Sequence, residues 1–488
     1  MEDINLVKDD INQAATLKLT NKFILFLGSS TFGILALFSL HFYKERAFFL
    51  DLSYILYLII KDNCLAIQVN RFVSFFTQGV AYSAMKLGLP LENIAQLYSL
   101  SFVVFQYLIF LVILKIAKDK WMALGLVLFN TLMVTHTFYW PTNELLQGMA
   151  VLFLFFALLN KSYNAEGFKK LLVHLLAIGS LITTCFAHPL LNIPVAFGLI
   201  LIATKDIKQL KSTGLYFIGL VSLYIIKQIY FSNYYDAYSM EGLENFIKLF
   251  PNYYTESMHN FFNFLIRDYY LFMLALIACT IFYIKERKFL RLALVLLSVV
   301  VYTLMINVSF PKNVNQFYIE AQYLILSVFV ILPLVLDIIP SIKNEKLLIA
   351  GISIVLIISL IRIYSTHDLY TERLEWNRNL LAKSRAIGKD KLILMDKELP
   401  KETLLLTWAM AYETWIMSTV ENGATQSIVA LKNEKKLDEF MDQRKVFLSK
   451  WIQDTYFKHP RKYFIFPDTM NTYRKFSLEE IIGKQKED

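Results

Sequence analysis

At 488 residues, 56% hydrophobic and 18% charged, the chain is too apolar for a soluble enzyme of this length. Its net charge of +9 does not indicate nucleic-acid binding, because the basic residues are spread over short connectors and are not gathered in one patch. The three cysteines (Cys64, Cys185 and Cys279) are too few for a disulfide framework.

Apolar segments long enough to cross a bilayer recur along the chain, and they predict an α-helical polytopic membrane protein with about 11 transmembrane helices. The first follows two acidic residues and has no small-residue cleavage site after it, so we interpret it as an uncleaved anchor preceded by a cytoplasmic tail over residues 1–22. The segments are Phe23–Tyr43, Leu97–Leu114, Trp121–Phe138, Leu145–Leu159, Leu171–Ala187, Pro189–Thr204, Leu215–Phe231, Tyr269–Ile284, Leu290–Val308, Ala321–Asp337 and Leu347–Tyr364.

Lysine and arginine fall on alternate connectors between these segments. Lys115, Lys118 and Lys120 follow the second segment, whereas the connector from Trp140 to Glu144 after the third has no basic residue. Basic connectors stay in the cytoplasm, so the amino terminus is predicted to lie inside and everything after Tyr364 outside. We expect the protein to be integral to the plasma (inner) membrane.

Two outer loops interrupt the predicted bundle of residues 23–364. The first, 44–96, contains two short apolar runs with polar interruptions, Phe48–Ile60 and Phe72–Leu87. Such runs predict two amphipathic helices that lie on the membrane surface or against the bundle. The second loop, 232–268, is rich in tyrosine and phenylalanine, which is typical of an aromatic belt at the headgroups and also compatible with sugar stacking.

Residues 365–488 predict a small extracytoplasmic α+β domain. Strand-like runs occur at Lys391–Met395, Leu404–Trp408 and Tyr463–Phe466, and a charged helical run occupies Glu434–Lys450. We expect this domain to cap a cavity or to present an acceptor.

Polar and ionisable groups near the bilayer gather on the predicted outer side. Because such groups are costly at membrane depth, they are candidates for function. Each has a simpler explanation as well, such as a solvent-facing residue or a headgroup anchor. The candidates are Glu45, Asp51, Arg71, His136, Trp140, Asn143, Glu144 and His188.

The overall layout resembles the GT-C glycosyltransferases, which take a sugar from a polyprenyl-phosphate carrier at the outer leaflet. Two stretches of the sequence carry the resemblance. They are NRFVSFFTQGVAYSAMKLGLPLENIAQLYSLSFVVFQYLIFLVILKIAKDKWMAL over Asn70–Leu124 and HTFYWPTNELLQGMAVLFLFFALL from His136. The acidic pair often found after the first span of that superfamily is absent: Glu45 stands beside Arg46, and Asp51 stands alone in FFLDLSY.

The resemblance implies a membrane glycosyltransferase that uses a polyprenyl-phosphate-linked sugar donor and an envelope lipid, glycan or protein acceptor. Sugar transfer requires a carboxylate to accept the acceptor proton or to hold a divalent cation, Mg²⁺ or Mn²⁺, and it requires donors to the leaving phosphate. Asp51 is predicted as that carboxylate and Arg71 as the phosphate partner. Glu144 and His136 are predicted as further catalytic residues that support Asp51 or orient the acceptor. The remaining candidates are predicted to bind substrate, and they are His188, Glu45, Asn143 and Trp140.

Other classes of protein remain open on the sequence. A transporter or flippase for a lipid-linked or envelope glycan would place polar groups near the bilayer midplane, often in a two-fold repeat, and no repeat is visible. A polysaccharide polymerase or ligase would carry its large loop between middle or late spans. A non-enzymatic membrane scaffold is the third alternative.

Overall fold

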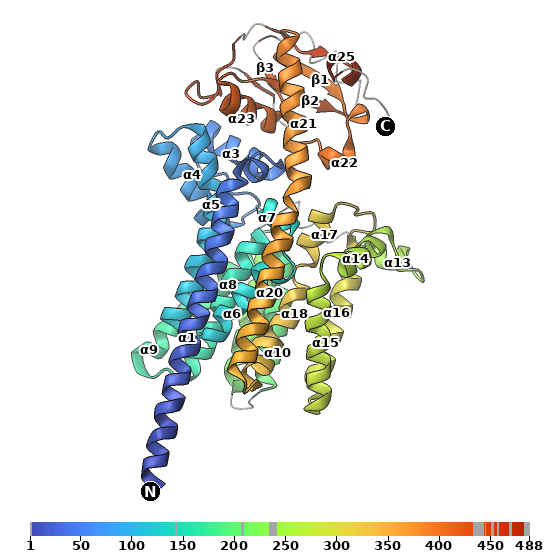
Figure 1. The fold of residues 1–488 in the computed structure, drawn as a ribbon. Coiled ribbons are helices and arrows are strands. Elements are labelled where there is room, and N and C mark those ends of the chain that lie inside the picture. Colours follow the sequence, from blue (N-terminus) through green and yellow to red (C-terminus); the bar gives the residue numbers. More distant parts are fainter. Residues whose placement is uncertain are drawn as a thin grey trace.

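The protein is a helical bundle with a small mixed domain at one end (Figure 1). The computed structural model describes residues 2–141, 144–205, 209–233, 242–432, 444, 446–449, 453–455, 458–467 and 471–482. In the bundle and its loops the helices are α1 (Glu2–His41), α2 (Tyr43–Ala47), α3 (Leu50–Asp62), η1 (Phe72–Ser74), α4 (Phe75–Lys86), α5 (Leu91–Leu111), η2 (Val112–Ala117), α6 (Lys120–Leu132), α7 (His136–Tyr139), α8 (Glu144–Tyr163), α9 (Gly167–Ala187), η3 (Pro189–Leu191), α10 (Asn192–Ala203), α11 (Leu210–Tyr230), η5 (Gly242–Glu244), α13 (Asn245–Lys248), α14 (Glu256–Arg267), α15 (Tyr270–Lys285), α16 (Phe289–Ser309), α17 (Gln316–Tyr323), α18 (Leu326–Pro333), η6 (Leu334–Ile338), α19 (Ile339–Ser341) and α20 (Glu345–Ser365). The carboxy-terminal elements are α21 (His367–Ala386), β1 (Lys391–Met395), η7 (Asp396–Glu398), α22 (Lys401–Leu404), α23 (Met410–Asn422), β2 (Ser427–Leu431), β3 (Val446–Leu448), β4 (Gln453–Thr455), β5 (Arg474–Lys475) and α25 (Leu478–Ile482).

The bundle has the character of a membrane protein. In the part of the chain that the structure describes, seven helices are long and apolar enough to cross a membrane, and two bent pairs, α14 with α15 and α17 with α18, raise this number to nine if each pair is one span. Every one of the eleven predicted segments overlaps a helix. However, α6 and the helical stretch Pro189–Ala203 are shorter than a typical span. The membrane class is therefore confirmed, and the number eleven stays a prediction.

Burial separates central helices from peripheral ones. In α8, 83% of the apolar stretch is buried inside the protein, whereas in α11 the corresponding share is 22%. A helix that is apolar all round must be surrounded by other helices or by lipid. We infer that α8 forms the centre of the bundle and that α11 exposes most of its surface to lipid.

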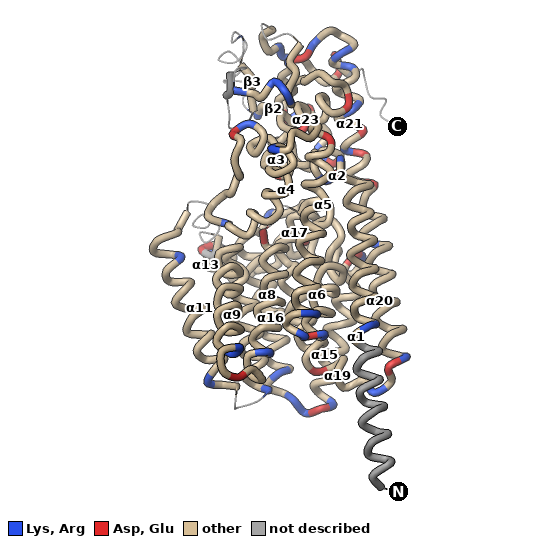
Figure 2. Tube along the Cα trace, turned by 90° about the vertical axis from the view of Figure 1, so that its left-hand side faces the viewer, with Lys and Arg blue, Asp and Glu red and all other residues tan. Residues whose placement is uncertain are grey.

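Lysine and arginine residues of the bundle collect around one of its ends, and the carboxy-terminal domain lies at the other end (Figure 2). The bundle between them contains few charged residues, as expected for a segment surrounded by hydrocarbon. The chain enters the bundle through α1 from the basic end, far from the carboxy-terminal domain (Figure 1). This distribution agrees with the charge alternation in the sequence, although the orientation in a particular membrane remains a prediction.

The loop 44–96 forms the two predicted helices, because α3 and α4 coincide with the two apolar runs to within three residues at each boundary. Both helices lie between the bundle and the carboxy-terminal domain (Figure 1). In the second loop, residues 234–241 lie outside the described part of the chain, and the remainder includes α13 and α14.

The carboxy-terminal region is an α+β domain joined to the bundle through α20 and α21, which run one after the other from the bundle into the domain (Figure 1). Its main sheet has the strand order β2-β1-β5 with parallel pairing, and β3 pairs with β4 in antiparallel fashion. The buried side chains of α23, including Trp415 and Tyr412, supply its core.

Of the elements predicted for this domain, Lys391–Met395 is confirmed as β1. The strand at Leu404–Trp408 is wrong, because α22 ends at Leu404 and an irregular connection follows. The strand at Tyr463–Phe466 is also wrong: Tyr463 ends a turn, and the next three residues form an irregular segment in which Phe464 and Phe466 are buried and Ile465 is 51% exposed. The helix predicted over Glu434–Lys450 lies largely outside the described residues, and its end forms the strand β3 instead. An apolar run that is partly buried does not by itself select a strand, because strand formation depends on pairing and packing with neighbouring segments.

Candidate functional site

Asp51 and Trp140 meet at the end of the bundle that faces the carboxy-terminal domain. The Trp140 indole Nε1 donates a hydrogen bond to Asp51 Oδ2 over 2.8 Å. Phe317 and Tyr318 pack edge-on against the indole, with ring centroids 5.1 and 5.0 Å away. Because packing fixes the indole and Asp51 lies in the first turn of α3, the carboxylate has a defined position.

Arg71 and Glu144 form an ion pair next to Asp51. Arg71 Nη1 lies 2.9 Å from Glu144 Oε2, and both side chains are largely buried. Arg71 precedes η1 in the first loop, whereas Glu144 begins α8, where a carboxylate is favoured by the helix dipole. The charges of both residues act on Asp51, so the three side chains form one electrostatic unit.

His188 joins the same group from the turn between α9 and α10. Its Nδ1 accepts a hydrogen bond from the Leu190 backbone N–H over 3.2 Å, which leaves Nε2 to carry the proton of a neutral ring. Burial, followed by the positive charges of Arg71 and Lys227, holds the pKa of His188 well below its ordinary value. The ring of His188 is therefore neutral, with its proton on Nε2, and it lies close enough to Arg71 for the guanidinium charge to act on it.

The environment of Asp51 suits a general base. Its pKa is raised to about 6 in total: burial is the largest cause, the hydrogen bond from Trp140 acts in the opposite direction, and the negative charge of Glu144 adds to the effect of burial. A carboxylate with a pKa close to neutrality is ionised in most molecules at pH 7 and still accepts a proton readily.

Two predicted site residues point elsewhere. His136 Nδ1 lies 3.2 Å from Tyr370 Oη, and its ring is also hydrogen-bonded with Gln316. Glu45 accepts a hydrogen bond from Thr371 Oγ1 over 3.1 Å. Both side chains therefore contact the start of α21 and not Asp51, and their predicted roles in catalysis and substrate binding stay predictions. Asn143 lies outside the described residues.

Glu320 is a buried residue whose role the sequence did not reveal. Its carboxylate accepts six hydrogen bonds: from the backbone N–H groups of Thr135, His136 and Thr137, from the hydroxyls of Thr135 and Thr137, and from Tyr269 Oη at 2.8 Å. It thereby fixes the turn that leads into α7 and Trp140. Thr135 and Thr137, whose hydroxyls bind this carboxylate, are the sequence feature from which the turn could have been predicted.

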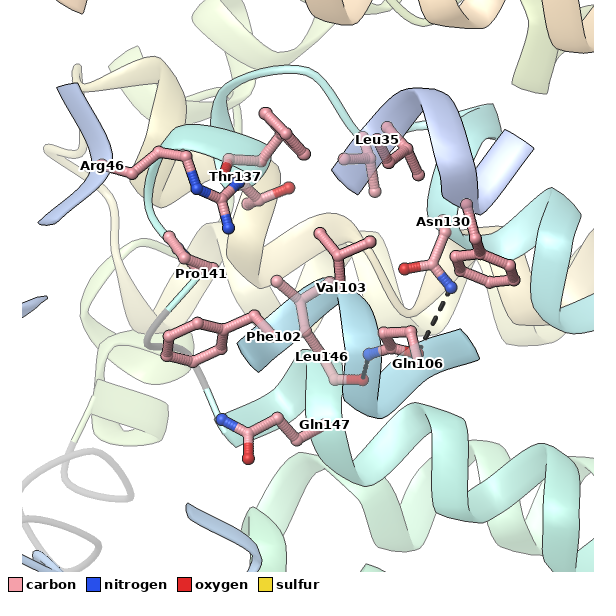
Figure 3. Close-up of a pocket in the computed structure, with 13 residues that line it drawn as sticks. Leu35, Arg46, Phe102, Val103, Gln106, Asn130, Thr137, Pro141, Leu146 and Gln147 are labelled. Carbon is pink, nitrogen blue, oxygen red and sulfur yellow. Dashed lines mark hydrogen bonds between the residues drawn. The ribbon is translucent and has the colours of Figure 1, made fainter. Parts of the chain in front are cut away.

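A half-open cavity lies in the bundle beside this turn, and Thr137 and Pro141 are among the residues that line it (Figure 3). The cavity has a volume of about 40 Å³, which is enough for a few water molecules but not for a sugar. Arg46 lines it, is 1% exposed, and donates to Ser99 Oγ at 2.8 Å and to the Ser99 carbonyl at 3.0 Å. Gln106, Asn130 and Gln147 supply the other amide groups that are visible there (Figure 3). The cavity belongs to the bundle interior, and the candidate site is the cluster around Asp51.

An apolar groove runs along the outer face of α4. Phe75 and Phe76 are 52% and 53% exposed, whereas Thr77 and Gln78 on the opposite face are 1% and 3% exposed. Polar residues turned inward and apolar residues turned outward are the pattern of a helix in contact with lipid. The groove measures about 520 Å³, and its lining comprises Phe75, Phe76, Gly79, Val80, Ser83, Ala84, Leu87, Leu89 and Leu97.

Among the residues that the structure describes, no group of three or more His, Cys, Asp or Glu side chains is arranged to hold a metal ion. The negative charge of Glu144 repels that of Asp51, and Glu144 is already paired with Arg71. These residues do not form a complete ligand set for Mg²⁺ or Mn²⁺, so no reaction step is assigned to a metal.

Comparison of the chain with protein-family models, with curated proteins and with solved structures finds no match. The geometry around Asp51 is therefore the basis on which a function is assigned.

Proposed function

We propose that this protein is an integral membrane glycosyltransferase that moves a sugar from a polyprenyl-phosphate carrier to an envelope lipid, glycan or protein acceptor at the outer leaflet of the plasma membrane. The observation that supports this most is the grouping of Asp51, Trp140, Arg71, Glu144 and His188. They come from three parts of the chain, namely the first loop, the connector Trp140–Glu144 and the turn at His188, and they meet at one end of the bundle.

In the proposed reaction, a hydroxyl oxygen of the acceptor attacks C1 of the sugar. The bond from C1 to the carrier phosphate breaks, and its electron pair leaves with the phosphate. The hydroxyl proton passes to the Asp51 carboxylate. Arg71 and the Nε2–H of His188 are the donors that stabilise the charge on the departing phosphate.

The groove on α4 supports a lipid-linked donor. A polyprenyl chain is a long hydrocarbon, and it needs an apolar channel that is open to the bilayer. Arg71 directly precedes η1 and α4, so a chain lying in the groove would carry its phosphate toward the ion pair. A transporter, in contrast, would have its polar groups near the middle of the membrane. Here the charged side chains grouped with Asp51 lie at one end of the bundle.

Loss of the protein is expected to leave one class of envelope lipid or glycan lighter by a single sugar unit. Mass spectrometry of envelope lipids and glycans from cells with and without the protein tests this. The missing unit should return with the parental gene and should not return with Asp51→Asn. Identical spectra, with the donor lipid confined to one leaflet in cells that lack the protein, would favour the flippase alternative.

The rate of sugar transfer is expected to depend on pH through Asp51. Because only the ionised carboxylate accepts a proton and its pKa is raised to about 6, kcat/KM should fall about tenfold per pH unit below that value and level off above it. Transfer rates of the purified protein between pH 4.5 and 8 measure this dependence. A profile that falls with an inflection near pH 4, the ordinary range of an aspartate, would contradict the role of its buried environment.

A further inference from the structure

The carboxy-terminal domain reaches the backbone at the start of α3. Glu413 on α23 accepts a hydrogen bond from the backbone N–H of Leu50 through Oε1, over 2.8 Å. Leu50 is the first residue of α3, and its φ of +42° is a conformation that a branched side chain rarely adopts. A conformation of this kind persists only where surrounding groups hold it. Glu413 is the group that contacts the amide of this residue.

The positive charge of Arg373 neutralises the buried carboxylate of Glu413 and so stabilises its contact with Leu50. Arg373 on α21 pairs with Glu413 over 2.5 Å, and the two side chains are 4% and 1% exposed. Arg373 also donates from Nε to the Leu404 carbonyl over 3.0 Å, and its guanidinium lies 4.9 Å from the centre of the Phe49 ring. Phe49 and Leu50, the two residues before Asp51, are therefore both contacted by the carboxy-terminal domain.

We propose that Glu413 is a positioning residue for Asp51, which acts by holding the Leu50 amide and so fixing the first turn of α3, with Arg373 as its neutralising partner. The carboxy-terminal domain is then part of the candidate active site and not only a cover over it. This inference rests on the proposed function for its catalytic meaning, but the positioning itself does not depend on sugar transfer.

Other contacts keep the domain docked when Glu413 is changed. Glu421, at the far end of α23, pairs with Lys44 of α2 over 2.8 Å. On the side of α4, Tyr463 Oη donates to the Met85 carbonyl over 3.1 Å. A substitution at residue 413 therefore tests the local contact with Leu50 and leaves these attachments in place.

The test compares two double variants, Arg373→Met with Glu413→Gln and Arg373→Met with Glu413→Met. Both remove the buried charges together, which costs far less than leaving one of them unpaired. They differ only at residue 413, where glutamine keeps an oxygen acceptor for the Leu50 amide and methionine, of similar size, does not. The single substitutions Glu413→Gln and Glu413→Met form a second pair if the double variants do not fold.

The readout is labelling of Asp51 by dicyclohexylcarbodiimide in isolated membranes, followed by peptide mass spectrometry over a range of pH. The reagent reacts with protonated carboxyls, so the midpoint reports the protonation of Asp51 without any substrate. The charged groups that act on Asp51 are Glu144 of α8 and Arg71 of the first loop, and neither is changed in these variants. Glu421→Gln, which weakens docking away from Leu50, is the matched control.

The glutamine variant and Glu421→Gln should keep the parental midpoint, near pH 6. In the methionine variant the first turn of α3 is released toward water, and a fall of one pH unit in the midpoint would reduce labelling at pH 6 about fivefold. An unchanged midpoint in a folded methionine variant overturns the proposal, and so does an equal shift in Glu421→Gln. If labelling shifts as expected while Asp51→Asn retains sugar transfer, the positioning stands and the proposed function fails.

Discussion

Replacing Asp51 with asparagine is expected to abolish sugar transfer, with a loss of about 10²–10⁴-fold in kcat, the usual contribution of a general base. Asparagine is nearly isosteric with aspartate, and its amide oxygen still accepts the hydrogen bond that the Trp140 indole donates to Asp51 Oδ2. The substitution therefore removes the proton acceptor and preserves the surrounding geometry. Turnover of a radiolabelled polyprenyl-phosphate sugar by the purified variant measures the effect.

Asp62 offers the matched control for this experiment, because it ends the same helix, and its side chain is 47% exposed beside Lys61. Asp62→Asn should transfer sugar at the parental rate. An Asp51→Asn variant that turns over as fast as Asp62→Asn removes Asp51 from the mechanism. A loss in both would indicate that α3 as a whole is sensitive to substitution, and it would not support a specific role for Asp51.

Replacing Glu320 with leucine is expected to prevent stable folding. The substitution leaves three buried backbone N–H groups, those of Thr135, His136 and Thr137, without the carboxylate that accepts from them. Each unsatisfied buried group costs about 1–3 kcal/mol, so the free energy of unfolding should fall by at least roughly 3 kcal/mol. A loss of that size is a large part of the stability of a typical domain.

Thermal unfolding of the purified protein in detergent, followed by intrinsic fluorescence, measures this loss. Glu320→Gln is the matched variant. Glutamine keeps one acceptor oxygen, but its N–H₂ group replaces the other oxygen and cannot accept the hydrogen bonds that were donated to it. Its midpoint should lie between those of the parent and Glu320→Leu. If Glu320→Leu unfolds at the parental temperature, the carboxylate does not hold the Thr135–Thr137 turn.

The site was only partly predictable. Asp51, Arg71, Glu144 and Trp140 stood out in the sequence because charged or amphipathic groups beside long apolar segments are costly and therefore informative. Glu45 and His136 met the same criterion and yet face α21. Proximity to a predicted membrane boundary gives the depth of a side chain but not the direction in which it points, since that depends on the rotation of the helix and on its packing.

The membrane class, the charge asymmetry between the two ends and the two helices of the first loop were determined by the sequence alone. Each follows from a local quantity, such as the length of an apolar run or the charge of a connector, which needs no knowledge of distant contacts. Tertiary structure alone decided that Arg71 pairs with Glu144, that Glu320 caps the turn at Thr135 and that Glu413 holds Leu50. Leu50 and Glu413 are 363 residues apart, and contacts of that kind are fixed by how helices pack together, which no local pattern records.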